Sequence, residues 1–104
     1  MIFPVNFLAP AVREFREAVA WYDAQSPGLG SRFRAEVSLG IARITRHPSL
    51  WAQISPDIRR YRMTRFPYAI LYVLLEDRVL VVAVSHFHRK PDHWRGRWAE
   101  GGGR

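Results

Sequence analysis

Two apolar runs separated by three charged residues constrain the fold of this chain more than any other feature. Residues 68–75 are apolar almost throughout, residues 79–84 are apolar throughout, and Glu76, Asp77 and Arg78 lie between them. Each run has the length of a β-strand and the charged triplet suits a tight turn, so the runs are predicted to pair as antiparallel neighbours. Because a continuously apolar strand needs cover on both faces, both are expected at the centre of a sheet.

The N-terminal half of the chain is expected to form a short strand followed by two helices. Residues 2–8 are rich in apolar side chains, and Pro4 suits an edge strand because it has no N–H for a ladder. Beyond it, apolar residues recur at spacings of three and four, which predicts two helices that pair as a hairpin with one shared apolar face. The first carries Val12, Phe15, Val19 and Tyr22, and the second, with Ser31 as its cap, carries Phe33, Val37, Ile41 and Ile44.

A third strand is predicted at residues 58–65, where polar and apolar side chains partly alternate. In an extended chain Arg60 and Arg62 fall on one face, and Tyr61 and Met63 fall on the other. The three strands are expected to form an antiparallel meander, and the helical hairpin can cover one face of it.

Two possibilities remain for the other face of the sheet. Either a short C-terminal helical segment within residues 91–98 lies over it, or an apolar patch stays open for another chain. The predicted fold class is α+β, with an N-terminal strand and a helical hairpin packed on a small antiparallel sheet and a short C-terminal helical segment. A chain of 104 residues supports one core, so residues 1–98 are predicted to form a single domain and residues 99–104 a flexible tail.

The charge of the chain is high and unevenly placed. The formal net charge is +7, and residues 58–104 hold ten Lys/Arg against four Asp/Glu, whereas residues 1–57 hold six against five. A basic half of this kind favours a nucleic acid, a nucleoprotein or an acidic protein as partner, although a solubilising surface has the same composition. The chain has no cysteine, no leader-like start and no apolar run of about 20 residues, so we expect a cytoplasmic protein without membrane contact.

Arginines and a histidine are the candidates for chemistry. Guanidinium groups bind phosphate in a bidentate manner, and the candidate residues are Arg60, Arg62, Arg65, Arg89 and Arg97. We expect them to converge on one patch, although each could instead pair with a glutamate of the helices. His86 could act as a general acid or base beside a bound phosphate, or could simply end a strand through hydrogen bonds.

The remaining aromatic and histidine residues allow narrower expectations. His86 and His88 share a strand face, but no third ligand has a suitable spacing, so neither a metal nor another cofactor is expected. Trp94 could pack on the sheet or stack on a nucleobase. Trp21 is assigned to the core or its margin.

An ordered set of short motifs resembles a known family over roughly residues 5–98. The motifs are Glu17-Ala18, Trp21-Tyr22, Pro27-Gly28-Leu29-Gly30 with Phe33, Glu36-Val37, Arg59-Arg60, Arg65-Phe66-Pro67-Tyr68 with Tyr72, Ala83-Val84-Ser85-His86, Arg89-Lys90-Pro91 and Trp94-Arg95-Gly96-Arg97. Together they resemble the RelE/ParE superfamily of toxins from bacterial type II toxin–antitoxin systems, often labelled plasmid stabilisation proteins. The resemblance implies a helical hairpin on a small antiparallel sheet, and a cognate antitoxin that wraps the toxin in a hetero-oligomer and shields its basic or apolar surface.

The superfamily divides by activity, and the motifs favour one branch. RelE-like members cleave messenger RNA in the ribosome with basic residues and a C-terminal tyrosine or histidine, whereas ParE-like members inhibit DNA gyrase. The Trp21-Tyr22 and Pro27 to Gly30 motifs resemble the ParE branch, and Lys90 is the single lysine of the chain, which departs from the RelE pattern.

Gyrase inhibition is therefore the expected activity, with two alternatives. The residues expected to contact the target are Arg60, Arg62, Arg89, Trp94 and Arg97. The first alternative is a ribosome-dependent ribonuclease, whose catalytic candidates would be Arg60, Arg62, Arg65, His86 and Arg89. The second is a non-toxic basic domain that only docks in a complex.

Overall fold

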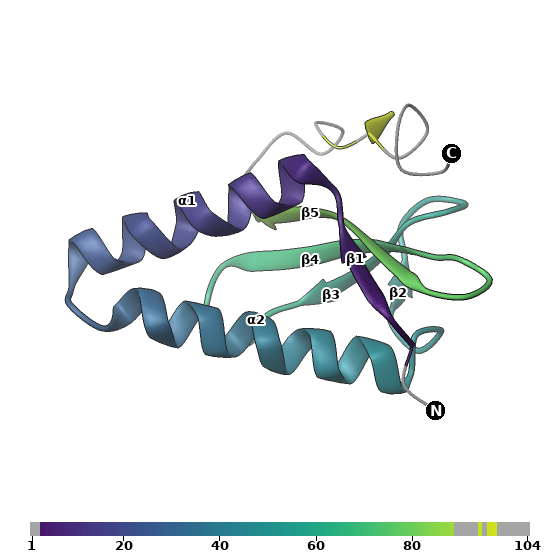
Figure 1. Ribbon diagram of the computed structural model, residues 1–104, viewed down its shortest axis with the longest axis horizontal. Helices are drawn as coiled ribbons and strands as arrows, with labels where there is room; N and C mark the ends of the chain where they lie inside the picture. Colours follow the sequence, from purple (N-terminus) through teal and green to yellow (C-terminus); the bar gives the residue numbers. More distant parts are fainter. Residues whose placement is uncertain (1–2, 89–93, 95, 98–104) are drawn as a thin grey trace.

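The computed structural model describes residues 3–88, 94, 96 and 97, and its two helices lie along one face of a five-stranded sheet (Figure 1). The elements in chain order are β1 (Val5–Phe7), α1 (Ala9–Gln25), α2 (Leu29–Arg46), β2 (Ala52–Gln53), β3 (Arg59–Arg62), β4 (Tyr68–Leu74) and β5 (Val79–His86). The expected α+β arrangement, with a strand and a helical hairpin ahead of a meander, is confirmed.

The sheet is mixed rather than wholly antiparallel. Its strand order is β1-β5-β4-β3-β2, and the predicted meander of β3, β4 and β5 is antiparallel throughout. The short β2 pairs with β3 and is also antiparallel. β1, in contrast, pairs with β5 in parallel. The helical hairpin and three strands separate β1 from β5, so no tight turn makes these two neighbours run in opposite directions.

The tip of the helical hairpin is fixed by glycines and one aspartate. Asp23 at the end of α1 accepts hydrogen bonds from the backbone N–H of Gly28 at 3.2 Å and of Gly30 at 2.9 Å. Gly28 has a φ of +89°, and a Cβ on Gly30 would lie 2.6 Å from the carbonyl oxygen of Val19. The expectation that Ser31 caps α2 is wrong, because the helix already begins at Leu29 with Gly28 as its N-cap.

The core between the hairpin and the sheet is dominated by aromatic rings. Phe33 is fully buried, and its ring stacks on Tyr22 and meets Phe66 and Tyr68 edge-on, at centroid distances of 5.0–5.3 Å. Edge-to-face and offset pairs of this kind add to the burial energy of large rings. Aromatic packing therefore joins α1 and α2 to the β3–β4 connection.

The opposite face of the sheet is also covered. Its apolar cluster consists of Ile58, Ala69, Leu71, Val73, Leu80, Val82, Ala83 and Trp94. Trp94 is 8% exposed, and the strand residues of this cluster are 0–4% exposed. The C-terminal segment thus lies over this face at Trp94, and the alternative of an open apolar patch is wrong for the described residues. Residues 91–93, 95 and 98 of the predicted segment, and the tail at 99–104, lie outside the described residues.

Within the part of the chain that the structure describes, neither helix combines the length and apolarity that a membrane span requires.

Candidate functional site

One end of the sheet gathers several of the residues singled out from the sequence. At this end β3 stops, β4 starts and β5 stops, and the register pairs Arg62 with Ala69 and Tyr68 with His86. Because side chains alternate along a strand, Arg62 and His86 project from opposite faces of the sheet. Burial agrees with this assignment, since Ala69 belongs to the cluster under Trp94 and Tyr68 packs against the helices.

The face away from the helices carries Arg60 and Arg62 next to one another on β3, as predicted. The guanidinium carbon of Arg62 lies 4.3 Å from the centroid of the Phe87 ring, which is the distance of a cation–π contact. A guanidinium held on a ring in this way can still donate from its N–H groups to a carboxylate or a phosphate. Phe87 is 40% exposed. We call Arg60, Arg62 and Phe87 the outer strip.

Arg60 is the more enclosed member of the outer strip. It stands opposite Leu71, and its Nε is buried without a hydrogen-bond partner among the described residues. A buried N–H that lacks an acceptor is costly, so an incoming acceptor that reached it would bind favourably. The outer strip can therefore bind an anionic group through two neighbouring guanidiniums.

His86 lies on the helix side of the sheet, in a groove against α1. The groove has a volume of about 480 Å³ and is lined by Glu14, Glu17, Ala18, Trp21, Tyr22, Pro67, Tyr68, Val84 and His86. His86 meets the Tyr68 ring edge-on at 5.1 Å, and its Nδ1 accepts a hydrogen bond from the backbone N–H of His88 at 3.0 Å. A neutral imidazole with this bond keeps its proton on Nε2, so Nδ1 is not free to act as a base.

The wall of this groove is aromatic. Trp21, assigned from the sequence to the core or its margin, is 58% exposed and meets Tyr22 edge-on at 5.1 Å. Burial, with a smaller contribution from the neighbouring Tyr68, raises the pKa of Tyr22 above its ordinary value of 10.0. Tyr22 therefore stays protonated at neutral pH and supplies packing rather than a catalytic base.

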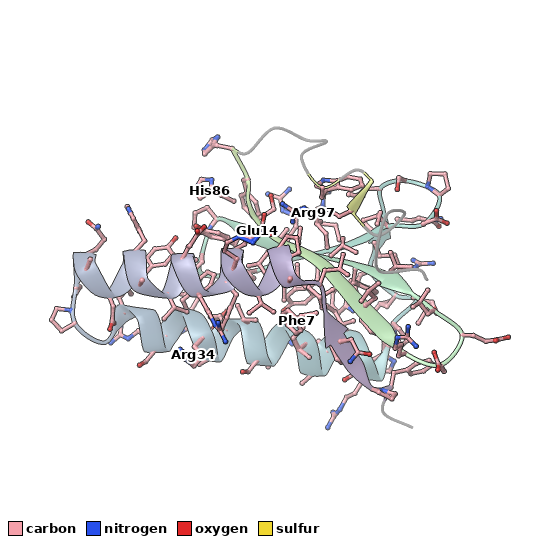
Figure 2. The ribbon with its side chains drawn as sticks, turned by 45° about the horizontal axis from the view of Figure 1, so that its top comes forward. Phe7, Glu14, Arg34, His86 and Arg97 are labelled. Carbon is pink, nitrogen blue, oxygen red and sulfur yellow. The ribbon has the colours of Figure 1, made fainter. Side chains whose placement is uncertain are left out.

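Arg97 is held inside the molecule. Figure 2 shows Glu14 on α1 and Arg97 turned toward one another next to β5, with Arg97 Nη2 donating to Glu14 Oε2 at 2.8 Å and Nη1 donating to Oε1 at 3.0 Å. Arg97 Nη1 also donates to the Val82 carbonyl, and Glu14 Oε1 accepts the Val84 N–H. β1 ends at Phe7, and beyond it no strand among the described residues pairs with that edge of β5, so the ion pair satisfies the exposed backbone groups there.

The candidate residues therefore do not form one patch, and the expectation of a single convergent arginine surface is wrong for the described residues. Arg60 and Arg62 lie together, Arg97 is an internal partner of Glu14, and Trp94 packs on the sheet. Arg65 lies over α2, where its Nε is 3.9 Å from Glu36 Oε2. Arg89 lies outside the described residues.

Sequence reasoning named Glu14 only as one possible arginine partner among the helix glutamates, and it missed the contributions of Phe87 and Trp21. Glu14 stands between Ala11 and Ala18 on the buried stripe of α1, and a carboxylate at such a position needs a cationic partner. Ser85 lies opposite Ala69 and therefore on the same face as Arg62. Phe87 comes two residues later, so alternation along the chain predicts the same face for it. The exposure of Trp21 could not be predicted from the sequence, because its position beside the apolar stripe of α1 is equally compatible with a partly buried side chain and with an exposed one. Among the described residues, no three histidine or carboxylate side chains gather as a metal site.

Comparisons with known proteins agree with this architecture. The model of the ParE toxin of the type II toxin–antitoxin system, parDE, matches residues 5–91. The chromosomal ParDE toxin–antitoxin system from P. aeruginosa is similar in structure, with a TM-score of 0.72 and 9% identity over 82% of this chain and 96% of that one. A mutant of the E. coli toxin RelE in the free state has a TM-score of 0.64 and 17% identity, over 100% and 98% of the two chains. No curated protein sequence matches the chain.

Proposed function

The chain belongs to the ParE toxin family of type II toxin–antitoxin systems, and from this premise we propose that it inhibits DNA gyrase through protein contacts. ParE-like members of the superfamily are the ones that the Trp21-Tyr22 and Pro27 to Gly30 motifs resemble. A cognate antitoxin is the partner that neutralises such a toxin, and a gyrase inhibitor acts in the cytoplasm, where the enzyme and its DNA are.

We favour gyrase inhibition over RNA cleavage because Arg62 and His86 lie on opposite faces of the sheet. A ribonuclease needs its general base or acid and its phosphate-binding cations around one phosphodiester. Here the histidine faces α1 and its Nδ1 is already hydrogen-bonded, whereas the paired arginines face away from the helices. This separation supports a toxin that binds its target over one that cleaves RNA.

We assign the outer strip of Arg60, Arg62 and Phe87 to the contact with gyrase. It combines an exposed aromatic ring with two arginines, the residue types that dominate the energy of protein interfaces. Of the other residues expected from the sequence to contact the target, Trp94 and Arg97 hold the C-terminal segment in place. Substitution of either residue would therefore weaken inhibition by destabilising the protein, and not by removing a contact with gyrase.

Expression of the chain without its antitoxin tests the proposal in cells. We expect growth arrest, plasmid DNA that loses negative supercoils, and messenger RNA of normal length. Messages cut at codons in the ribosomal A site, with supercoiling unchanged, would replace the gyrase proposal by the ribonuclease. Normal growth at full expression of soluble protein would instead favour a harmless docking domain.

A further inference from the structure

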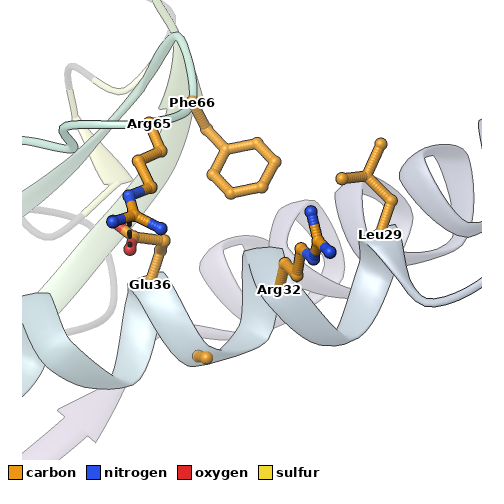
Figure 3. A pocket seen from close by; sticks show the side chains of 6 residues that line it. Leu29, Arg32, Glu36, Arg65 and Phe66 are labelled. Carbon is orange, nitrogen blue, oxygen red and sulfur yellow. Dashed lines mark ion pairs between the residues drawn. The ribbon is translucent and has the colours of Figure 1, made fainter.

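A groove separate from the outer strip lies between α2 and the connection from β3 to β4 (Figure 3). Its volume is about 600 Å³, and it is lined by Leu29, Arg32, Ala35, Glu36, Arg65 and Phe66. In Figure 3 the Phe66 ring lies between the side chains of Arg65 and Arg32, and the carboxylate of Glu36 points to Arg65. We call this the α2 groove.

The charges of the α2 groove are not balanced. The ion pair of Arg65 with Glu36 is long, at 3.9 Å, and the Arg65 side chain is 80% exposed. Arg32 is exposed and forms no ion pair with any residue that the structure describes. Two guanidiniums thus share one carboxylate, and one positive charge of the lining is uncompensated. A pair this long, with its arginine exposed, is weak, so an incoming anion can compete for Arg65 at small cost.

The floor of the α2 groove is apolar. Phe66 is 8% exposed, and Leu29 and Ala35 line the groove beside it. A ligand that fits both parts carries a carboxylate next to an aliphatic side chain. A nucleic acid fits less well, because two arginines provide too short a cationic track for its phosphate backbone.

We propose that the α2 groove binds an acidic peptide segment of a partner protein, in which a glutamate or aspartate is flanked by an aliphatic residue. The carboxylate bridges Arg32 and Arg65 by charge-assisted hydrogen bonds, and the aliphatic side chain covers Phe66 and Leu29. Glu36 acts as an internal competitor that occupies Arg65 while the groove is empty. The assignment does not depend on gyrase as the target, since it concerns another surface.

Titration of the full chain, labelled with nitrogen-15, tests the groove by NMR. The probe is an acetylated, amidated hexapeptide that alternates leucine and glutamate. We expect saturable shifts of the Arg65 Nε–Hε signal and of the backbone amides of Leu29, Arg32 and Phe66. The same peptide with glutamine in place of glutamate should leave these signals unmoved.

Matched variants separate the groove from general charge attraction. Arg32→Gln and Arg65→Gln should each weaken peptide binding about fivefold or more, the effect of removing one charge-assisted contact. Arg16→Gln, which removes the same charge from an exposed site on α1, should leave the affinity unchanged.

Glu36→Gln gives a prediction of opposite sign. Removal of the competitor should strengthen peptide binding by roughly two- to fivefold, which is the size of an exposed ion pair. Glu17→Gln on α1 changes the net charge equally and should have no effect. The proposal is overturned if the peptide moves none of the groove signals. It is also overturned if the Glu36 and Glu17 variants behave alike, or if a short single-stranded RNA moves the groove signals where the peptide does not.

Discussion

Glu14 and Arg97 form a doubly hydrogen-bonded ion pair between α1 and the C-terminal segment, with N–O distances of 2.8 and 3.0 Å. The same two side chains bond the Val84 N–H and the Val82 carbonyl of β5. Both side chains are largely buried, at 8% and 18% exposure. The pair therefore stands where a further strand would be and fastens the segment that carries Trp94.

Arg97→Met should lower the free energy of unfolding by about 3–5 kcal/mol, because it removes the cation that donates two hydrogen bonds to the buried Glu14 carboxylate. Denaturant unfolding measures this loss. The double variant Glu14→Gln with Arg97→Met should recover much of it, since the buried carboxylate is neutralised together with the loss of its arginine. Arg78→Met is the matched control, because the Asp77–Arg78 pair is exposed and contributes less than about 1 kcal/mol. An equally mild effect at Arg97 would contradict the structural role given to the ion pair.

Gly40→Ala should destabilise the protein although alanine is the better helix former. A Cβ on Gly40 would lie 2.8 Å from Tyr61 Cε1 and 2.9 Å from Ile70 Cδ1, so these buried side chains or α2 itself would have to shift. Overpacking of this kind costs about 1–3 kcal/mol, which outweighs a helix-propensity gain of about 1 kcal/mol. Thermal unfolding compares it with Ser38→Ala, an exposed position of the same helix where no loss is expected. A stabilised Gly40→Ala protein would show that the contact between α2 and the sheet is looser than described.

Stability should fall as the pH rises above 10, through the titration of Tyr72. Burial raises the pKa of this tyrosine from 10.0 to about 12, against a smaller lowering by Arg59, and its hydroxyl donates to the Pro48 carbonyl at 2.6 Å. The folded state then holds the proton more tightly than the unfolded state. The stabilisation is complete below the unfolded pKa near 10 and is lost as the pH approaches 12.

Denaturant midpoints at several alkaline pH values measure this decline, which we expect to amount to about 1–3 kcal/mol. Tyr72→Phe should remove most of the slope. Part of it should remain, because the pKa of Tyr22 is also raised. A slope identical in the wild type and in Tyr72→Phe would contradict the assignment to Tyr72.

Phe87→Leu tests the outer strip with little disturbance of the fold. Leucine keeps apolar volume but removes the ring on which the Arg62 guanidinium stacks, a contact worth about 0.5–1 kcal/mol. Stability should therefore change little, whereas gyrase inhibition should weaken severalfold because Arg62 loses its orientation. Unchanged inhibition together with unchanged stability would remove Phe87 from the interface.

Local patterns in the sequence were sufficient for most of the fold. Apolar periodicity located both helices, and the apolar runs with their charged turn located β4 and β5. The parallel pairing of β1 could not be predicted from local pattern, because it depends on how the hairpin packs. β2 has two exposed residues and no apolar signature.

The site was harder to predict than the fold. The alternation of side chains along a strand correctly predicted that Arg60 and Arg62 share a face. It gives no information on how residues of different strands lie relative to one another. His86 lies on the opposite face from Arg62 because of the register between β4 and β5. That register could not be predicted from the sequence. The partner of Arg97 could not be chosen from local sequence, since Glu14 lies 83 positions away. Contacts between residues this far apart in the sequence therefore decide which arginines are engaged inside the protein and which can contact a target.

Supercoiling of relaxed plasmid by purified gyrase is the most direct measurement of the central claim, with the wild type, Arg62→Gln and Arg16→Gln compared over a range of concentrations. We predict that the wild type and Arg16→Gln inhibit equally, and that Arg62→Gln requires about thirtyfold more protein, as for the loss of an interface hot spot of about 2 kcal/mol. In a parallel translation reaction the message should remain intact. Full gyrase activity at every wild-type concentration, with message cleaved in the translation reaction, would contradict the account.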